Sequence, residues 1–89
     1  MNVNYDWPVS LSIDETDGRT SAEVRLVMPG GDHLAGHGRA RRNPADREMA
    51  RIGAQIATAR AFSDLADRLL HAAATAIEDS THEPAHVHL

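Results

Sequence analysis

The sequence predicts an α+β fold, in which a three-stranded antiparallel meander packs on one long C-terminal helix in the order β-β-β-α. Three observations lead to this prediction. Apolar residues alternate with polar or small ones in three segments of the first 41 residues, which is the period of a half-buried strand. Short turn sequences separate the segments, and short turns join antiparallel neighbours. The second half of the chain has the apolar spacing of a helix.

The first predicted strand covers residues 7–13. Its alternating apolar positions are Trp7, Val9, Leu11 and Ile13. Pro8 has no backbone N–H to donate to a neighbouring strand, so this strand is expected at a sheet edge or beginning just after the proline. Residues 14–18 read Asp-Glu-Thr-Asp-Gly, which predicts a polar turn.

The second and third strands are predicted over residues 20–28 and 33–41, with a tight reversal between them. One face carries the apolar and small residues Ala22, Val24, Leu26, Met28, Leu34, Gly36, Gly38 and Ala40. Because Gly36 and Gly38 have no side-chain bulk, a helix is expected to lie close against this face. Polar residues of all three strands are left on the opposite, open face of the sheet. They are Ser10, Ser12, Glu23, Arg25, His37, Arg39 and Arg41, together with the apolar Val27.

The helix is predicted over residues 45–79, with a bend near Gly53, and a tail follows over residues 81–89. Asn43 suits the capping position and Pro44 the first helical position. The expected apolar stripe consists of Ala59, Phe62, Leu65, Ala66, Leu69, Leu70, Ala73, Ala76 and Ile77. The expected solvent face consists of Arg60, Asp64, Asp67, His71, Thr75 and Glu78.

Length and composition limit the class of protein. The 89 residues leave room for a single domain, 1–89, whose thin core favours oligomerisation. The absence of cysteine excludes disulfides and thiolate metal sites. No apolar run approaches a membrane span and no signal peptide opens the chain, so we expect a cytoplasmic protein without membrane contact. The net charge of −4 argues against indiscriminate nucleic-acid binding.

The middle of the chain is nevertheless basic. Residues 19–51 carry seven arginines against four acidic residues. Arginine suits bidentate phosphate contact. The candidate residues for RNA or partner binding are Arg25, His37, Arg39, Arg41 and Arg42. Three interpretations stay open at this point: a solvated face, contact with RNA or the ribosome, and a protein–protein interface.

One motif is typical of catalysis. His82-Glu83-Pro84-Ala85-His86 matches the H-E-x-x-H pattern, in which two histidines one helical turn apart bind zinc. Pro84 disfavours a helix at this point, and the segment lies in the tail. We therefore predict no catalytic residue, no metal site, no cofactor and no small-molecule substrate.

Several motifs together resemble a known family. They are Val9-Ser10-Leu11-Ser12-Ile13-Asp14-Glu15, Thr20-Ser21-Ala22, Leu34-Ala35-Gly36-His37-Gly38-Arg39-Ala40-Arg41, Asn43-Pro44-Ala45-Asp46-Arg47, Ile52-Gly53, Ala59-Arg60-Ala61-Phe62-Ser63-Asp64-Leu65, and Thr81-His82 with Pro84. This set resembles a family of small actinobacterial proteins of unknown function, classed as double-stranded-RNA-binding-domain-like, with dormancy- and hypoxia-induced mycobacterial members. The resemblance implies a strand–strand–strand–helix fold, a homodimer and a shape similar to ribosome hibernation factors. It implies no catalytic residues.

The sequence therefore predicts a non-enzymatic stress or dormancy protein that binds the ribosome or structured RNA through its arginine-bearing sheet face. The alternative is a homodimeric structural or protein-interaction module without RNA contact. The chain departs from the hibernation-factor pattern because it lacks the first helix of that fold, has no lysine and is net acidic.

Overall fold

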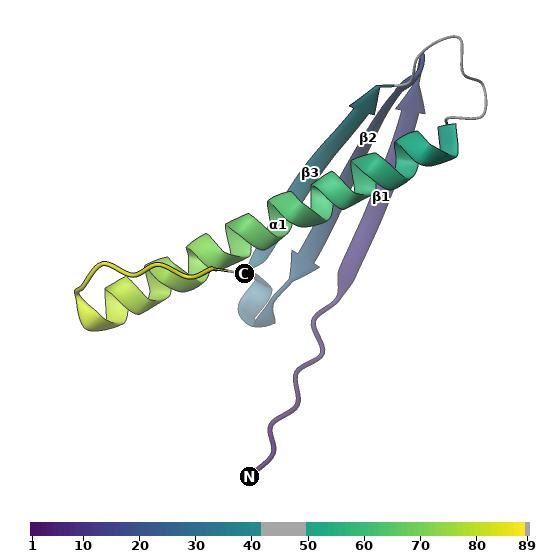
Figure 1. Ribbon diagram of the computed structural model, residues 1–89. Helices are drawn as coiled ribbons and strands as arrows, with labels where there is room; N and C mark the ends of the chain where they lie inside the picture. Colours follow the sequence, from purple (N-terminus) through teal and green to yellow (C-terminus); the bar gives the residue numbers. More distant parts are fainter. Residues whose placement is uncertain (42–49, 89) are drawn as a thin grey trace.

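The computed structural model describes residues 1–41 and 50–88 and confirms the predicted α+β fold (Figure 1). Strands β1 (Val9–Thr16), β2 (Arg19–Val27) and β3 (His33–Arg41) form one antiparallel sheet in the order β1-β2-β3. A short 3₁₀ turn, η1 (Pro29–Gly31), lies between β2 and β3, and the long helix α1 (Ala50–Thr81) follows. The helix covers one face of the sheet (Figure 1).

The hairpin of β1 and β2 turns on two residues. Asp17 and Gly18 both have positive φ angles, 52° and 75°, as a type I′ turn requires, and Thr16 pairs with Arg19. The predicted five-residue turn over 14–18 is therefore too long. Asp14, Glu15 and Thr16 continue the strand, because the Asp-Gly pair alone provides the reversal. β1 begins at Val9, so Pro8 precedes it.

The reversal between β2 and β3 uses glycine in the same way. Gly30 and Gly31 both have φ angles of 86°, a region that L side chains rarely adopt. The N–H of Met28 donates to the carbonyl of Asp32 at 2.8 Å, and Val27 pairs with His33. β3 then occupies residues 33–41, as predicted.

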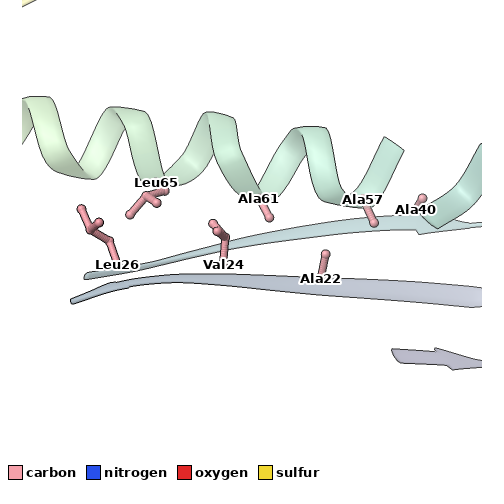
Figure 2. Packing of buried hydrophobic residues seen from close by; sticks show 7 residues of the cluster. All are labelled: Ala22, Val24, Leu26, Ala40, Ala57, Ala61 and Leu65. Carbon is pink, nitrogen blue, oxygen red and sulfur yellow. The ribbon is translucent and has the colours of Figure 1, made fainter. Parts of the chain in front are cut away.

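The core lies between α1 and the strands β2 and β3. Figure 2 shows Val24 and Leu26 of β2 pointing toward the helix, and Ala61 and Leu65 pointing back toward the sheet. The buried apolar side chains are Ala22, Val24, Leu26, Ala40, Ala57, Ala61 and Leu65. Four of the seven are alanines and none is aromatic, so the core is thin.

Gly36 and Gly38 explain this small-residue core. A Cβ atom at Gly36 would overlap the carbonyl oxygen of Ala61, and one at Gly38 would overlap that of Ala57. The helix backbone therefore rests directly on the backbone of β3, as the alternating glycines predicted. Such close approach favours small residues on the facing side of the helix, where Ala57 and Ala61 lie, and Leu65 follows at the end of the contact.

The predicted phase of the helix is right for Leu65, which is buried, and for Leu69, which packs against the core, but wrong for several other positions. The side that meets the sheet consists of Gly53, Ala57, Ala61 and Leu65, each four residues after the last. Phe62 and Ile77, placed on the apolar stripe by the sequence pattern, are 46% and 44% exposed. The reason is that a sheet surface of glycines selects small residues, which carry little weight in a hydrophobic pattern.

The boundaries of α1 differ partly from the prediction. The capping residues Asn43 and Pro44 and the predicted start at residue 45 lie outside the described residues. From Ala50 the helix is continuous through Gly53, where a Cβ atom would stand 3.3 Å from Thr20 Oγ1. This glycine thus allows close packing rather than marking a break. The helix ends at Thr81, and His82 has a φ angle of 61°.

Candidate functional site on the open face of the sheet

The face of the sheet that points away from α1 is polar and exposed. Alternate residues of each strand build it: Ser10, Ser12, Asp14, Thr16, Arg19, Ser21, Glu23, Arg25, Val27, His33, Ala35, His37, Arg39 and Arg41. No element in the described part of the chain covers this face. The described residues therefore leave this face open to a partner.

Three arginines gather at one end of this face. Arg19 of β2 stands directly opposite Arg41 of β3, and the next pair on the same face joins Ser21 to Arg39. We call Arg19, Arg39 and Arg41 the arginine cluster. Like charges on directly opposite residues repel each other and destabilise a sheet. An anion bound between these arginines would reduce that repulsion.

The arginine cluster lines a shallow hollow at the end of the sheet. Its rim is mixed in charge, because Arg60 of α1 and the carboxylates of Asp14 and Asp17 also border it. Among the described residues, no member of the cluster has a carboxylate oxygen within 4.0 Å of its guanidinium. The hollow thus holds four guanidinium groups and two carboxylates, and the basic charge prevails.

The middle of the open face is electrically balanced. Glu23 accepts a hydrogen bond from Arg25 at 3.3 Å and lies 3.0 Å from His37 Nε2. The hydrogen bond with His37 is the main reason that the pKa of Glu23 lies below its ordinary value, with Arg25 adding to the effect. Arg25 and His37 are therefore engaged by an acidic neighbour and offer less free positive charge than the arginine cluster.

The structure divides the predicted binding residues into two groups. Arg39 and Arg41 lie in the cluster, and Arg25 and His37 lie around Glu23. Arg42 lies outside the described residues. Sequence reasoning missed Arg19, because the second strand was expected to begin only at Thr20. The Asp-Gly turn signal would have placed it, since a two-residue turn puts Arg19 opposite Thr16 and on the face of Arg25.

The histidine-containing tail does not have the geometry of a zinc protease. His82 to Val87 is not helical, so His82 and His86 are not one helical turn apart. Among the described residues, no three His, Cys, Asp or Glu side chains are grouped as a metal site requires. The tail returns along α1, where the N–H of Ala85 donates to Glu78 Oε1 at 2.9 Å (Figure 1).

Within residues 50–81, α1 carries too many polar and charged side chains to cross a bilayer.

Comparison with known proteins identifies relatives along nearly the whole chain. The uncharacterized protein Mb1767 of Mycobacterium bovis is 46% identical over 84 residues, which are 94% of this chain and 88% of that protein. The uncharacterized protein Rv2632c of Mycobacterium tuberculosis is 45% identical over 83 residues, or 93% and 88% of the two chains. None of these names denotes an enzyme.

A solved structure also matches. The crystal structure of Rv2632c superposes with a TM-score of 0.82 and 42% identity, and the match covers 93% of this chain and 98% of that one. The family model described as Rv2632c-like matches residues 5–86. The predicted resemblance to an actinobacterial family of unknown function is thereby confirmed: this chain belongs to the Rv2632c-like family.

Proposed function

We propose that this chain is a non-enzymatic binding protein that contacts the phosphates of structured RNA, such as ribosomal RNA, through the arginine cluster. The observation that carries the proposal is the direct pairing of Arg19 with Arg41, with Arg39 beside them, on an uncovered sheet face. Planar guanidinium groups bind phosphate oxygens in pairs, and three of them at one sheet end offer several such contacts to a nucleic-acid backbone.

The mode of contact follows from what the open face contains. Its described residues include no Phe, Tyr or Trp on which a base could stack, so contact with phosphates and sugars is favoured over readout of bases. Recognition would then depend on the shape of a double-stranded segment. The overall charge of −4 keeps background affinity for nucleic acid low.

The physiological setting that we propose is stress or dormancy, in line with the resemblance to a double-stranded-RNA-binding-domain-like family. The association would be with the translation machinery in non-growing cells. It is checked by sedimentation of lysates from growing and starved cells on a gradient at low salt. Migration with ribosomal particles after starvation is the expected result, and a protein confined to the light fractions in both states would contradict it.

A direct test uses a fluorescent RNA duplex of about 20 base pairs, long enough for a compact domain to contact. Three phosphate contacts predict a slope of about −2.7 for log affinity against log salt, or roughly 40-fold weaker binding between 50 and 200 mM salt. The triple variant Arg19→Ala, Arg39→Ala, Arg41→Ala is expected to lose both the affinity and the salt dependence.

The matched control is Arg25→Ala, which removes an arginine of the same face that is already paired with Glu23. It is expected to weaken binding far less than any single substitution in the arginine cluster. Equal losses for Arg25→Ala and Arg39→Ala would mean that the face acts through its total charge and not through the cluster. Absence of binding by the wild-type protein at 50 mM salt would overturn the RNA proposal.

The second candidate function is a homodimeric structural or protein-interaction module without RNA contact. The observation that favours it is an exposed row of apolar side chains, Val9, Leu11 and Ile13, which are 53%, 43% and 47% exposed on β1. A molar mass twice that of the chain, together with no affinity for the duplex, would decide for this candidate.

A further inference from the structure

The helix-facing side of the sheet is only half covered. Val9, Leu11 and Ile13 pair with Leu26, Val24 and Ala22, so all six side chains share one face. The three residues on β2 are at most 6% exposed, whereas those on β1 are about half exposed. The difference arises because α1 lies over β2 and β3, where the glycines admit it, and leaves β1 bare (Figure 1).

The flank of α1 beside β1 continues this apolar surface. Ala54, Thr58 and Ala59 line a shallow hollow together with Ile13, and Arg51 and Gln55 border the same hollow. Phe62 follows one turn after Thr58 on the same row of the helix and is 46% exposed. We call Val9, Leu11, Ile13, Ala54, Ala59 and Phe62 the apolar face. None of its members is charged.

The outer edge of β1 is also unpaired in the described part of the chain. The carbonyl of Pro8 accepts from the N–H of Val27 at 2.9 Å, so even-numbered residues here direct their backbone groups toward β2. By alternation, Val9, Leu11 and Ile13 direct theirs outward. The same three residues thus present both apolar side chains and open backbone groups, which is the combination that invites strand pairing.

The opposite edge of the sheet is closed by α1 itself. The N–H of His37 donates to Asp64 Oδ2 at 2.8 Å, and Arg60 donates to the carbonyl of Arg39 at 2.7 Å. Both are outward-facing backbone groups of β3. An added strand would have to displace these side chains, so β1 is the edge left for association.

The chain exposes more area than a compact monomer of its mass. The chain exposes 7016 Å², whereas a compact monomer of 9.7 kDa is expected to expose about 5,100 Å². Its radius of gyration is 16.8 Å, against about 12 Å for a compact domain of this length. The extended residues 1–8 and the end of α1 that projects beyond the sheet contribute to this excess, and so does the half-exposed row Val9, Leu11 and Ile13 (Figure 1).

From these observations we infer that a second copy of this chain pairs with it along β1, edge to edge and antiparallel, and that the two apolar faces join. An uncharged apolar face is self-complementary, as a two-fold interface requires. Centring the two-fold axis on Leu11 sets Val9 opposite Ile13 of the second copy, so every residue of the row meets an apolar one. The product is a six-stranded sheet.

This inference specifies the surface for the homodimer candidate and is independent of RNA binding. The axis stands perpendicular to the sheet, so both helices lie on one side and both arginine clusters on the other. Failure of the RNA assay would leave the dimer intact, and a monomeric protein with full affinity for the duplex would leave the RNA proposal intact.

The test uses single cysteines, because the chain has none of its own. Leu11 of the two copies would face each other with Cα atoms about 5.5 Å apart, within the range of a disulfide. Leu11→Cys is therefore expected to form a covalent dimer under mild oxidation. The control is Val27→Cys, at an apolar strand residue that is 39% exposed on the other face of the sheet, and it should stay monomeric on a non-reducing gel.

Light scattering on a sizing column and hydrogen exchange complete the experiment. The wild-type mass should be twice 9.7 kDa, and the N–H groups of Leu11 and Ile13 should become protected as the protein concentration rises. Ile13→Glu should return the mass to that of one chain; if it unfolds instead, the cysteine and exchange results still decide. A mass of 9.7 kDa at every concentration overturns the inference, and so does a dimer in which both cysteine variants cross-link equally.

Discussion

The two edge strands of the sheet differ in what happens to their outward-facing backbone groups. At the outer edge of β3, side chains of α1 bind such groups, whereas at the outer edge of β1 these groups are exposed. Asp64 and Arg60 close the first edge through His37 and Arg39. Val9, Leu11 and Ile13 leave the second edge apolar and half exposed. The comparison teaches that one helix, placed off-centre, can protect a single edge of a small sheet and leave the other for association.

The position of the helix follows from two residues of β3. Gly36 and Gly38 bring the backbone of α1 down onto that strand, which places Asp64 and Arg60 within reach of its edge. With the helix there, it meets β1 only beside Ile13 and leaves Val9 and Leu11 about half exposed. The glycines therefore decide which edge is protected and which face is left bare.

The largest loss of stability is expected from Gly38→Ala, which would break the close contact between the backbones of β3 and α1. The added Cβ would overlap the backbone of Ala57 and Ala61, so the helix must move away from β3. Overpacking of this kind should cost about 3 kcal/mol of unfolding free energy. Urea unfolding followed by circular dichroism measures it.

The matched control for that variant is Gly53→Ala on α1. Its Cβ would meet only the Thr20 side chain at 3.3 Å, and alanine favours the helix by about 1 kcal/mol. We expect its stability to stay within about 1 kcal/mol of the wild type. Equal destabilisation by both variants would show that α1 does not depend on close contact with β3.

A smaller effect on stability is expected from Asp64→Ala, which would open the closed edge. The N–H of His37 loses its acceptor and Arg68 loses an ion-pair partner at 3.2 Å. The urea midpoint should fall by less than for Gly38→Ala, and light scattering should detect species larger than the wild-type assembly, since both edges are then open. Asp67→Ala, at an exposed acidic residue of the same helix, should change neither property.

The smallest loss of stability is expected at low pH. Protonation of Asp64 weakens its hydrogen bond with the His37 N–H without removing the side chain. The pKa of Asp64 lies below its ordinary value of 3.8, chiefly because Asp64 accepts a hydrogen bond from the backbone N–H of His37. The pKa of Glu23 lies below its ordinary value of 4.5, chiefly because of its hydrogen bond with the His37 side chain. Both groups are therefore more acidic in the folded chain than in the unfolded chain. Their contribution is present above about pH 4.5 and is lost as the pH falls through the folded-state pKa values.

The urea midpoint should accordingly be level from pH 7 to about pH 5 and should fall below about pH 4.5. The double variant Asp64→Asn, Glu23→Gln keeps the shapes of both side chains and should flatten this acid branch. An acid branch as steep as that of the wild type would assign the pH dependence to other carboxyl groups.

Much of the sheet could be predicted because its signals are local. Alternation placed the faces of all three strands, and the glycines of β3 predicted close docking of a helix. The turn residues Asp17 and Gly18 were recognised, but their two-residue length was not used. For that reason the end of β1 and the position of Arg19 were missed.

The phase of α1 could be predicted only in part from hydrophobicity, which placed Leu65 and Leu69 against the sheet. Phe62 and Ile77 add weight to an apolar pattern, yet they are exposed, whereas the small residues Ala57 and Ala61 lie against Gly38 and Gly36. Arg60 and Asp64 were expected in solvent for the same reason. Their contacts with the edge of β3 depend on the height of the helix above the sheet, which no spacing along the chain encodes.

The length of α1 has a consequence for how the helix keeps its shape. Its 32 residues span about 48 Å, whereas a nine-residue strand spans about 30 Å, so the end of the helix projects beyond the sheet (Figure 1). The projecting part is rich in alanine, with Ala72, Ala73, Ala74 and Ala76 in one turn and a half. Near Ala57 the chain is helical because the sheet fixes it there, whereas beyond Leu70 it is helical because its residues favour that conformation by themselves.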